Sequence, residues 1–231
     1  MPNNHKTFEC ITKGSVERRD IAISNLIIAG WTGRDKAAIA AHIEELALFG
    51  VPRPASTPIF YRVSAGLLTI GDRIQTMGGD GSGEIEPVYF ALEDGLWVGV
   101  GSDHTDRKAE TQGITLAKQL CPKPVAPTLW RFEDVVDHWD QVTLRSKVVR
   151  DGTRSIYQEG PVSAMMRPED LISQYTGGNQ VLPANTAMFG GTMAVEGGIA
   201  PADVFEMTLE DPVLGRKIEH SYRIEVLPVL G

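Results

Sequence analysis

A short stretch, Gly83-Glu84-Ile85-Glu86-Pro87-Val88-Tyr89-Phe90, constrains this chain more than any other. Its pattern is typical of the start of a strand, where residues i and i+2 project from the same face. We therefore expect Glu84 and Glu86 to lie side by side. Like charges at that separation repel each other, and burial strengthens the repulsion. The fold must then supply a counter-charge, as an arginine, a lysine or a hard metal ion.

The length of the chain bounds the number of domains. Its 231 residues are enough for one sizeable core, as one large domain or as one domain with a small appendage. The 42% of hydrophobic residues is an ordinary globular content. We predict a single domain over residues 1–231, with an N-terminal strand and helix region over 1–56 and a β core over 57–231.

Charge and cysteine content exclude several classes of partner. The formal net charge of −8 disfavours nucleic acid, because binding to a phosphate backbone requires a basic surface. Two cysteines make neither a disulfide framework nor a zinc cluster, and they fit a reducing compartment. Residues 1–6 lack the apolar core of a signal peptide, and the apolar run 26–29 is far too short to span a membrane. We predict a cytoplasmic protein with no membrane or nucleic-acid partner.

The distribution of glycine and proline predicts a mostly β (α+β) fold with short helices. The 24 glycines and 14 prolines are spread along the whole chain, and few stretches have helical periodicity. Asp151-Gly152 is a strong hairpin signal. The strands we expect cover 21–31, 57–64, 84–92, 96–101, 142–149, 155–158, 205–209 and 217–227, and the helices cover 35–49, 133–138 and a segment from 167 to 177.

The helix expected over 35–49 carries a possible acid–base pair. Apolar residues recur there at helical spacing, and Gly50 ends the pattern. His42 and Glu45 are i,i+3 neighbours on one face of this helix. A carboxylate beside an imidazole can orient and charge it. The alternative is a histidine packed in the core.

A third carboxylate is placed to join the glutamates. The strands 84–92 and 96–101 form a candidate hairpin, and Asp103 follows the second strand. An antiparallel hairpin brings the start of one strand beside the end of the other. Three carboxylates without a cysteine suit a hard cation such as Mg²⁺, Mn²⁺ or Ca²⁺. The alternative is that Glu84 and Glu86 line a solvated strand face while Asp103 caps a turn.

Two further features have more than one interpretation. Lys118 follows the nearly apolar run 114–117, where its stem would cover apolar surface. Residues 77–83 contain four glycines and form either a flexible loop or a close approach of backbone to a ligand. A phosphate nest is disfavoured there, because no Lys-Ser/Thr ending and no helix follow.

In their order along the chain, these motifs resemble the fumarylacetoacetate hydrolase family. More narrowly, the whole chain is similar to an uncharacterised branch related to that family, from about residue 26 to the end. The matching segments are Glu84-x-Glu86, Asp103-x-Thr105-x-Arg107, Leu116-Ala117-Lys118, Asp151-Gly152, Gln158-x-Gly160 and Gly191-Thr192. His42-x-x-Glu45 matches the His-x-x-Glu of a mobile helical lid, and Phe60-Tyr61-Arg62-Val63-Ser64 matches Phe-x-Lys-Pro-Ser with arginine in place of lysine.

The resemblance implies a fold and a metal site. The fold is a fumarylacetoacetate hydrolase-like mixed β-sandwich or roll with short helices and an N-terminal helical lid. The metal is Mg²⁺, with Mn²⁺ or Ca²⁺ as alternatives, held by Glu84, Glu86 and Asp103. Asp106 is the competing ligand to Asp103. The segment between Arg107 and Lys118 is shorter than is usual in the family, which bears on the substrate more than on the metal.

The resemblance also implies an activity. It is that of a metal-dependent hydrolase or lyase that cleaves a C–C bond next to a carbonyl, in a small anionic 2-oxo acid or 1,3-dicarbonyl acid, within a homodimer. The implied catalytic residues are His42, Glu45 and Lys118, and the implied substrate-binding residues are Arg62, Ser64, Arg107 and Thr192. The alternatives are a decarboxylase, isomerase or hydratase on the same metal site, a non-catalytic metal- and acid-binding protein, and a β-rich interaction domain without a site.

Overall fold

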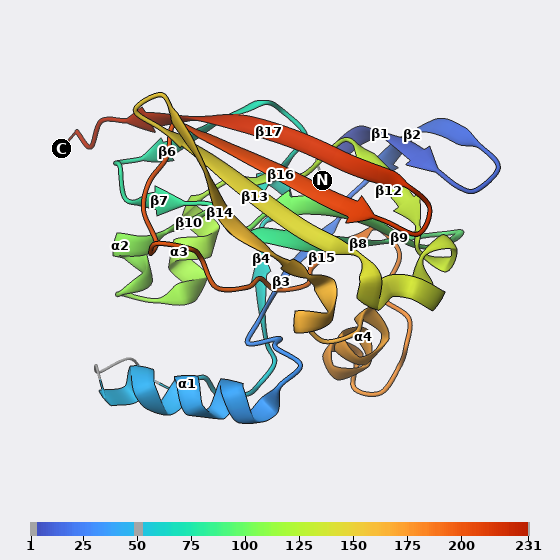
Figure 1. Ribbon diagram of the computed structural model, residues 1–231, viewed down its shortest axis with the longest axis horizontal. Helices are drawn as coiled ribbons and strands as arrows, with labels where there is room; N and C mark the ends of the chain where they lie inside the picture. Colours follow the sequence, from blue (N-terminus) through green and yellow to red (C-terminus); the bar gives the residue numbers. More distant parts are fainter. Residues whose placement is uncertain (1–3, 49–52, 231) are drawn as a thin grey trace.

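The strand at whose start the paired glutamates lie, β8, is in the middle of the larger of the two main sheets (Figure 1). The computed structural model describes residues 4–48 and 53–230, and for residues 42 and 45–48 it describes the backbone alone. The larger sheet has eight strands in the order β2-β1-β12-β9-β8-β15-β3-β4. Their bounds are β1 His5–Ile11, β2 Val16–Ala22, β3 Asn25–Gly30, β4 Ile59–Val63, β8 Ile85–Leu92, β9 Gly95–Ser102, β12 Thr128–Arg131 and β15 Thr186–Phe189.

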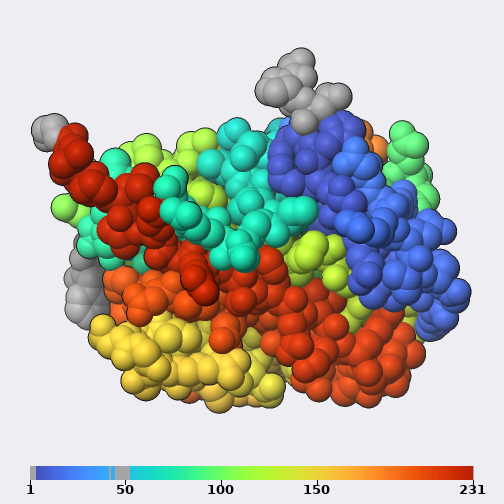
Figure 2. All heavy atoms as spheres, turned by 90° about the horizontal axis from the view of Figure 1, so that it is seen from above, coloured from blue at the N-terminus to red at the C-terminus, as the bar shows by residue number. Residues whose placement is uncertain are grey.

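The second sheet has five strands in the order β14-β13-β16-β17-β6 and covers one side of the first sheet (Figure 1). Seen from above, its outer face lies beside the N-terminal strands (Figure 2). Its strands are β6 Arg73–Met77, β13 Thr143–Arg150, β14 Thr153–Pro161, β16 Val204–Asp211 and β17 Arg216–Leu227. Two short pairs complete the β structure, β7 Gly81–Ser82 with β10 Thr105–Asp106, and β5 Leu68–Thr69 with β11 Lys123–Pro124.

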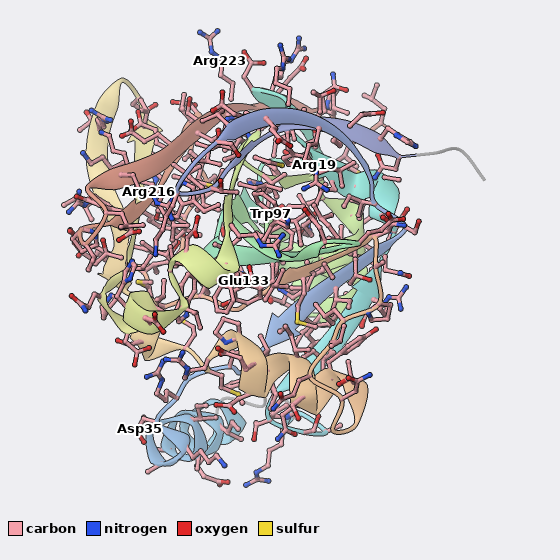
Figure 3. All side chains as sticks on the ribbon, turned by 90° about the vertical axis from the view of Figure 1, so that its right-hand side faces the viewer. Arg19, Asp35, Trp97, Glu133, Arg216 and Arg223 are labelled. Carbon is pink, nitrogen blue, oxygen red and sulfur yellow. The ribbon has the colours of Figure 1, made fainter. Side chains whose placement is uncertain are left out.

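The helices are short and lie around the edges of the sheets. In the described part of the chain, no helix has the length and apolar character needed to cross a membrane. Figure 3 shows α1, with Asp35 at its start, beside α4 and below the strands. The α-helices are α1 Lys36–Leu48, α2 Arg107–Glu110, α3 Ile114–Leu120 and α4 Pro168–Thr176, and the 3₁₀ helices are η1 Ala65–Leu67, η2 Phe132–Asp134, η3 Val136–Gln141 and η4 Val162–Ala164.

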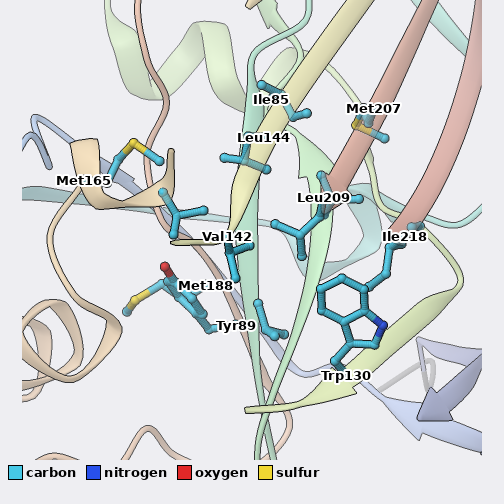
Figure 4. Close-up of a cluster of buried hydrophobic side chains, with 14 of the residues drawn as sticks. Ile85, Tyr89, Trp130, Val142, Leu144, Met165, Met188, Met207, Leu209 and Ile218 are labelled. Carbon is cyan, nitrogen blue, oxygen red and sulfur yellow. The ribbon is translucent and has the colours of Figure 1, made fainter. Parts of the chain in front are cut away.

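Alternation along β8 builds two cores, one on each face of the eight-stranded sheet. Ile85 and Tyr89 face the five-stranded sheet, where they join a cluster that includes Leu144 (Figure 4). Val88 and Phe90 point the other way, into a second cluster of buried residues. Because successive side chains of a strand point to opposite faces, the glutamates at positions 84 and 86 are turned away from the core that Ile85 fills.

The mostly β (α+β) fold predicted from the sequence is confirmed. The strands expected over 84–92 and 96–101 are β8 and β9, and the helix expected over 35–49 is α1. Asp151 and Gly152 both have positive φ, 50° and 77°, as a two-residue hairpin turn requires. Gly177 ends α4 in the left-handed conformation, with φ of 70°.

Two predictions of secondary structure were wrong in detail. The strand expected over 21–31 is two strands, since β2 ends at Ala22 and β3 begins at Asn25. Ser24 between them donates its backbone N–H to the carbonyl of Asn185, 2.8 Å away, instead of to either strand. The helix expected over 133–138 is η2 followed by η3, and the chain has non-helical dihedral angles at His138 inside η3.

Asp211, buried at the end of β16, is expected to contribute to stability. Its carboxylate accepts hydrogen bonds from His138 at 3.0 Å, from the N–H of Val213 and Leu214 at 3.1 Å, and from Arg216 at 3.3 Å. Asp211→Asn removes the charge that these donors face, and we expect it to cost about 1.5–3 kcal/mol at pH 7. Urea unfolding of the variant and of the exposed control Asp137→Asn measures this cost.

The effect of Asp211 should depend on pH with a defined sign. Burial raises the pKa of this carboxyl group, but the N–H of Leu214 and the His138 ring outweigh burial and hold the pKa below its ordinary value of 3.8. A carboxylate with a depressed pKa stabilises the fold above its unfolded-state pKa. The stability gap between wild type and Asp211→Asn should therefore close as the pH falls below 3.8. A gap that is constant from pH 7 to pH 2 contradicts this prediction.

Candidate metal centre

Three carboxylates meet at one end of the β8–β9 hairpin. Glu86 lies in β8, Glu84 directly precedes this strand, and Asp103 directly follows β9. The antiparallel register pairs Ile85 with Ser102, so Glu84 and Asp103 lie opposite each other. The backbone N–H of Asp103 donates to the carbonyl of Glu84 at 2.9 Å. One oxygen from each of the three side chains lies within 4.8 Å of the others.

Glu86 is held in place by a backbone contact. Its side chain is buried, and its Oε2 accepts a hydrogen bond from the N–H of Gly191 at 2.7 Å. Gly191 has a φ of +93°, and a Cβ at this position would lie 1.8 Å from Oγ1 of Thr32. Glycine is therefore required for this close approach of backbone to carboxylate. The contact commits one oxygen of Glu86 and leaves the other for a further ligand.

Two lysines contact the fully buried Asp103. Nζ of Lys118, in α3, donates to Oδ2 of Asp103 and lies 3.8 Å from Oε2 of Glu84. Nζ of Lys123 lies 3.3 Å from Oδ1 and donates to the carbonyls of His104 at 2.6 Å and Cys121 at 3.1 Å. Sequence analysis missed Lys123, because a single lysine between two prolines carries no signal of burial.

The charges of the site are unevenly balanced. Burial, with a contribution from Asp103, raises the pKa of Glu86 well above its ordinary value. Burial also acts to raise the pKa of Asp103, but Lys118 and Lys123 outweigh it and lower that pKa. The structure thus stabilises the ionised form of Asp103 and destabilises that of Glu86. A cation beside Glu86 would relieve this cost.

The donor set fits a hard divalent cation. All three groups offer oxygen, the ligand type that Mg²⁺, Mn²⁺ and Ca²⁺ prefer. Oδ1 of Asp103 is buried and accepts no well-formed hydrogen bond from the described residues. The Lys123 ammonium group, 3.3 Å away, is already a counter-charge to this oxygen, so the fit to a metal rests on the three oxygen donors. Asp106, the competing ligand, is instead the N-cap of α2, and its Oδ1 accepts from the N–H of Ala109 at 2.8 Å.

Arg107 and Thr192 lie at the site, but their polar atoms face protein groups. The Arg107 guanidinium lies 3.0 Å from Glu84 and 3.0 Å from Glu110, and its Nε donates to Ser82 at 2.7 Å. The Thr192 hydroxyl donates to the carbonyl of Ile85 at 2.6 Å and accepts from Gln158 at 2.7 Å. The counter-charges to Glu84 are thus Arg107 and Lys118, which the family resemblance assigns to substrate binding and to catalysis.

The structure does not bring Arg62 or Ser64 to the carboxylates. Arg62 is exposed on the edge strand β4 and contacts Tyr175 at 3.2 Å and Asn25 at 2.7 Å. The Ser64 hydroxyl caps η1, where it accepts from the N–H of Gly66 at 3.3 Å. Alternation along β4 turns Tyr61 toward the site instead, with its ring centre 5.9 Å from Nζ of Lys118.

The predicted acid–base pair can be placed only by its backbone. His42 and Glu45 both belong to α1, but their side chains lie outside the described part of the structure. Ala38 and Ile39, one turn earlier in the same helix, line the cavity that reaches the glutamates. The backbone position of α1 is therefore compatible with a helix that closes over the site, and the pair stays a prediction.

A polar network behind Glu84 was not visible in the sequence. The N–H of Glu84 donates to the hydroxyl of Ser102 at 3.2 Å, and the Tyr222 hydroxyl donates to that same oxygen at 2.8 Å. Nδ1 of His104 lies 3.0 Å from the Tyr222 hydroxyl. Burial, reinforced by Lys123 and Arg107, lowers the pKa of His104 to about 3, so this ring is neutral at pH 7. The network ties the site to β17, more than 100 residues away in the chain.

A cavity of about 680 Å³ opens onto Glu84, Glu86 and Lys118. Its walls come from the end of β3 and the segment after it, from the start of α1, from Tyr61, from α3 and from the segment that follows β15. Residues distant in sequence thus enclose one space beside the carboxylates. The volume suits a small ligand.

Structures of known enzymes share this fold. A fumarylpyruvate hydrolase from Pseudomonas aeruginosa, in complex with Mn²⁺ and pyruvate, is 18% identical with a TM-score of 0.64, and the match covers 98% of each chain. A candidate fumarylacetoacetate isomerase/hydrolase from Oleispira antarctica is 16% identical with a TM-score of 0.63, over 95% of this chain and 99% of that one. A 2-keto-3-deoxy-D-arabinonate dehydratase, complexed with magnesium and 2,5-dioxopentanoate, is 13% identical with a TM-score of 0.65, over 92% of this chain and 77% of that one.

The fold is therefore that of the fumarylacetoacetate hydrolase family, as the sequence motifs predicted. Within this fold, residues 29–222 match the family described as "Protein of unknown function (DUF2848)". The match spans most of the chain, and the protein belongs to the DUF2848 family. A search of the curated proteins found no match.

Proposed function

We propose that this protein is a divalent-metal-dependent enzyme that acts next to the carbonyl group of a small 2-oxo acid or 1,3-dicarbonyl acid. The observation that carries the proposal is the group Glu84, Glu86 and Asp103, whose two glutamates line a cavity together with Lys118. Two structures with this fold support it, since one is a complex with Mn²⁺ and pyruvate and the other a complex with magnesium and 2,5-dioxopentanoate. Mg²⁺ or Mn²⁺ is accordingly the proposed ion.

The three carboxylates would hold the ion, and the other residues would act on the substrate. A divalent ion at this place would supply Lewis acidity to the carbonyl group of the substrate. The Lys118 ammonium group, beside Glu84 and Asp103, adds positive charge where negative charge develops on the substrate. Burial lowers the pKa of Lys118, but Asp103 and Glu84 outweigh burial and raise it above its ordinary value, so this group stays charged.

C–C bond hydrolysis is the first form of the proposed reaction. In it, His42 oriented by Glu45 takes a proton from a water molecule that attacks the second carbonyl. The C–C bond then breaks, the hydroxyl group stays on the acyl fragment, and the carbanion fragment takes up a proton. The start of α1 lines the cavity, so this helix would exclude bulk water from the site.

Lyase chemistry on the same site is the second candidate, because one neighbour with this fold is a dehydratase. Decarboxylation, isomerisation and hydration of an oxo acid would need the same three protein carboxylates, Glu84, Glu86 and Asp103. These reactions differ in whether a water molecule attacks the substrate. Product analysis on an accepted substrate separates them.

An activity screen of the purified protein tests the proposal. With Mg²⁺ or Mn²⁺ we expect turnover of at least one acid in a panel of 2-oxo and 2,4-dioxo acids, and none in excess chelator. Glu84→Gln should lose roughly 10²–10³-fold in turnover, as expected when a group that stabilises the transition state is removed. The exposed Glu219→Gln is the matched control. Turnover that persists in chelator or in Glu84→Gln contradicts the proposal, and tight metal-dependent binding without turnover favours a non-catalytic binding protein.

A further inference from the structure

Resting on the proposed function, the charge distribution in the cavity points to the class of substrate. We propose that this site takes an oxo acid with a single carboxylate, whose distal end is uncharged and apolar. The carboxylate of the substrate and its neighbouring carbonyl lie at Glu84, Glu86 and Lys118. The distal end of the substrate lies against the other lining residues, which we call the outer wall: Trp31, Asp35, Ile39, Tyr61, Glu110, Ile114, Met193, Val195 and Ile199. We expect the site to disfavour a dicarboxylic oxo acid, which carries a second charge at that distal end.

The described lining of the cavity offers no free cation for a second carboxylate. Among the described residues that line it, Lys118 is the sole basic one, and it already faces Asp103 and Glu84. The remaining charged residues of the outer wall are acidic, Asp35 and Glu110. A distal carboxylate would lose its water without gaining an ion pair, and it would meet like charges.

The nearby arginines are committed to other carboxylates. Arg107 approaches Glu84 and Glu110, as described above. Beyond Ile39 lies a second cavity of about 510 Å³, whose basic residues are Arg34, Arg167 and Lys36. Both arginines face Asp140, Arg34 at 2.8 Å and Arg167 at 3.6 Å. Lys36 is exposed to solvent, where a single ion pair is weak.

The outer wall is suited to an apolar group. Its apolar side chains come from four separate segments, so a distal alkyl group would be surrounded instead of lying on one surface. Each methylene group buried there would strengthen binding about fourfold. The apolar wall residues are Trp31, Ile39, Tyr61, Ile114, Met193, Val195 and Ile199.

Two pairs of acids of equal length test the proposal. The first pair is 2-oxohexanoate and 2-oxohexanedioate, which differ in a terminal methyl or carboxylate group. Their dissociation constants are measured by calorimetry on the Mn²⁺-loaded protein and on the chelator-treated protein. The second pair, 2,4-dioxoheptanoate and 2,4-dioxoheptanedioate, gives kcat/KM. We expect the monocarboxylate to be favoured at least about tenfold in both measurements, which corresponds to one unfavourable contact of a charged group.

A variant that adds a cation to the wall makes the test specific. Ile199 lines the cavity and is 55% exposed, so Ile199→Lys should fold normally. It should tighten binding of the dicarboxylate about tenfold, and it should not tighten binding of the monocarboxylate, whose alkyl end loses one apolar contact. Val181→Lys is the control, because Val181 is 69% exposed and lies outside the cavity lining.

Each outcome separates the two proposals. A dicarboxylate that binds wild type as tightly as the monocarboxylate, or more tightly, overturns the inference and leaves the metal-dependent function standing. Equal responses of Ile199→Lys and Val181→Lys overturn the assignment of the distal end to this wall. If Mn²⁺ strengthens the binding of neither acid, the proposed function fails, and the inference that rests on it fails too.

Discussion

Replacing Glu86 with glutamine is expected to remove the response of the protein to divalent ions without destabilising the metal-free protein. Glutamine keeps an oxygen for the N–H of Gly191, so the contact at 2.7 Å can persist. It removes a buried negative charge whose pKa burial raises well above the ordinary value. A carboxyl group with a raised pKa destabilises the fold at neutral pH, because its ionised form is the disfavoured one. The same charge is what a cation would bind.

Thermal unfolding with and without Mn²⁺ measures both halves of this prediction. At an ion concentration one hundred times its Kd, the stabilisation is about 2.7 kcal/mol, which raises Tm by about 5–11 °C for a chain of this size. A hundredfold loss of affinity in Glu86→Gln leaves about 0.4 kcal/mol at that concentration. The metal-free variant should unfold at the same temperature as metal-free wild type, or higher. Glu219→Gln, on the exposed face of β17, should respond to Mn²⁺ as wild type does.

A wild-type Tm that Mn²⁺ and Mg²⁺ leave unchanged contradicts the metal assignment. A metal-free Glu86→Gln that unfolds several degrees below wild type would show instead that the Glu86 charge stabilises the fold. The three carboxylates would then be a structural ion-pair cluster with Lys118 and Lys123. The two halves of the prediction thus fail independently.

The grouping of the three carboxylates could be predicted from the sequence, because it depends on local geometry alone. The i,i+2 spacing places Glu84 and Glu86 on one face, and the tight hairpin brings Asp103 back beside them within twenty residues. Strands β8 and β9 could also be predicted, because each is an apolar run bounded by turn residues. Strand β2 was missed, since VERRDIA is mostly polar and its sole buried side chain is Ile21.

The residues that surround the carboxylates could not be predicted from the sequence, because their positions depend on packing between distant segments. Arg62 was assigned to substrate from a motif, yet the register of β4 turns Tyr61 inward and Arg62 outward. A shift of one residue in a strand reverses which side chains face a site, and a motif does not record the register. The contact between Tyr222 and Ser102 spans 120 residues and has no signature in either segment.

Substitutions of the two lysines that contact Asp103 should have different effects, one on turnover and one on stability. Both are buried and both face the same carboxylate, Lys118 at Oδ2 and Lys123 at Oδ1. Lys118 also lines the cavity, and we expect Lys118→Met to lower turnover about 10²–10³-fold with a modest change in Tm, because Asp103 keeps Lys123 as a counter-charge. Lys123 lies outside the cavity lining and holds two backbone carbonyls as well.

Removing Lys123 should therefore act first on folding. Lys123→Met keeps most of the side-chain volume but leaves Asp103 and the carbonyls of His104 and Cys121 without this donor. Asp103 keeps Lys118 as a counter-charge, so the main loss is the donor to two buried carbonyls. A buried acceptor left without a donor costs about 1–3 kcal/mol, so the two together lower Tm by roughly 4–24 °C. The comparison is made by calorimetry on both variants and on the control Lys147→Met, with turnover measured well below each Tm. Lys118 borders the cavity while Lys123 lies wholly within the protein, so we expect the first to act on turnover and the second on stability. A Lys123→Met protein with wild-type Tm, or a Lys118→Met protein with wild-type turnover, would contradict this expectation.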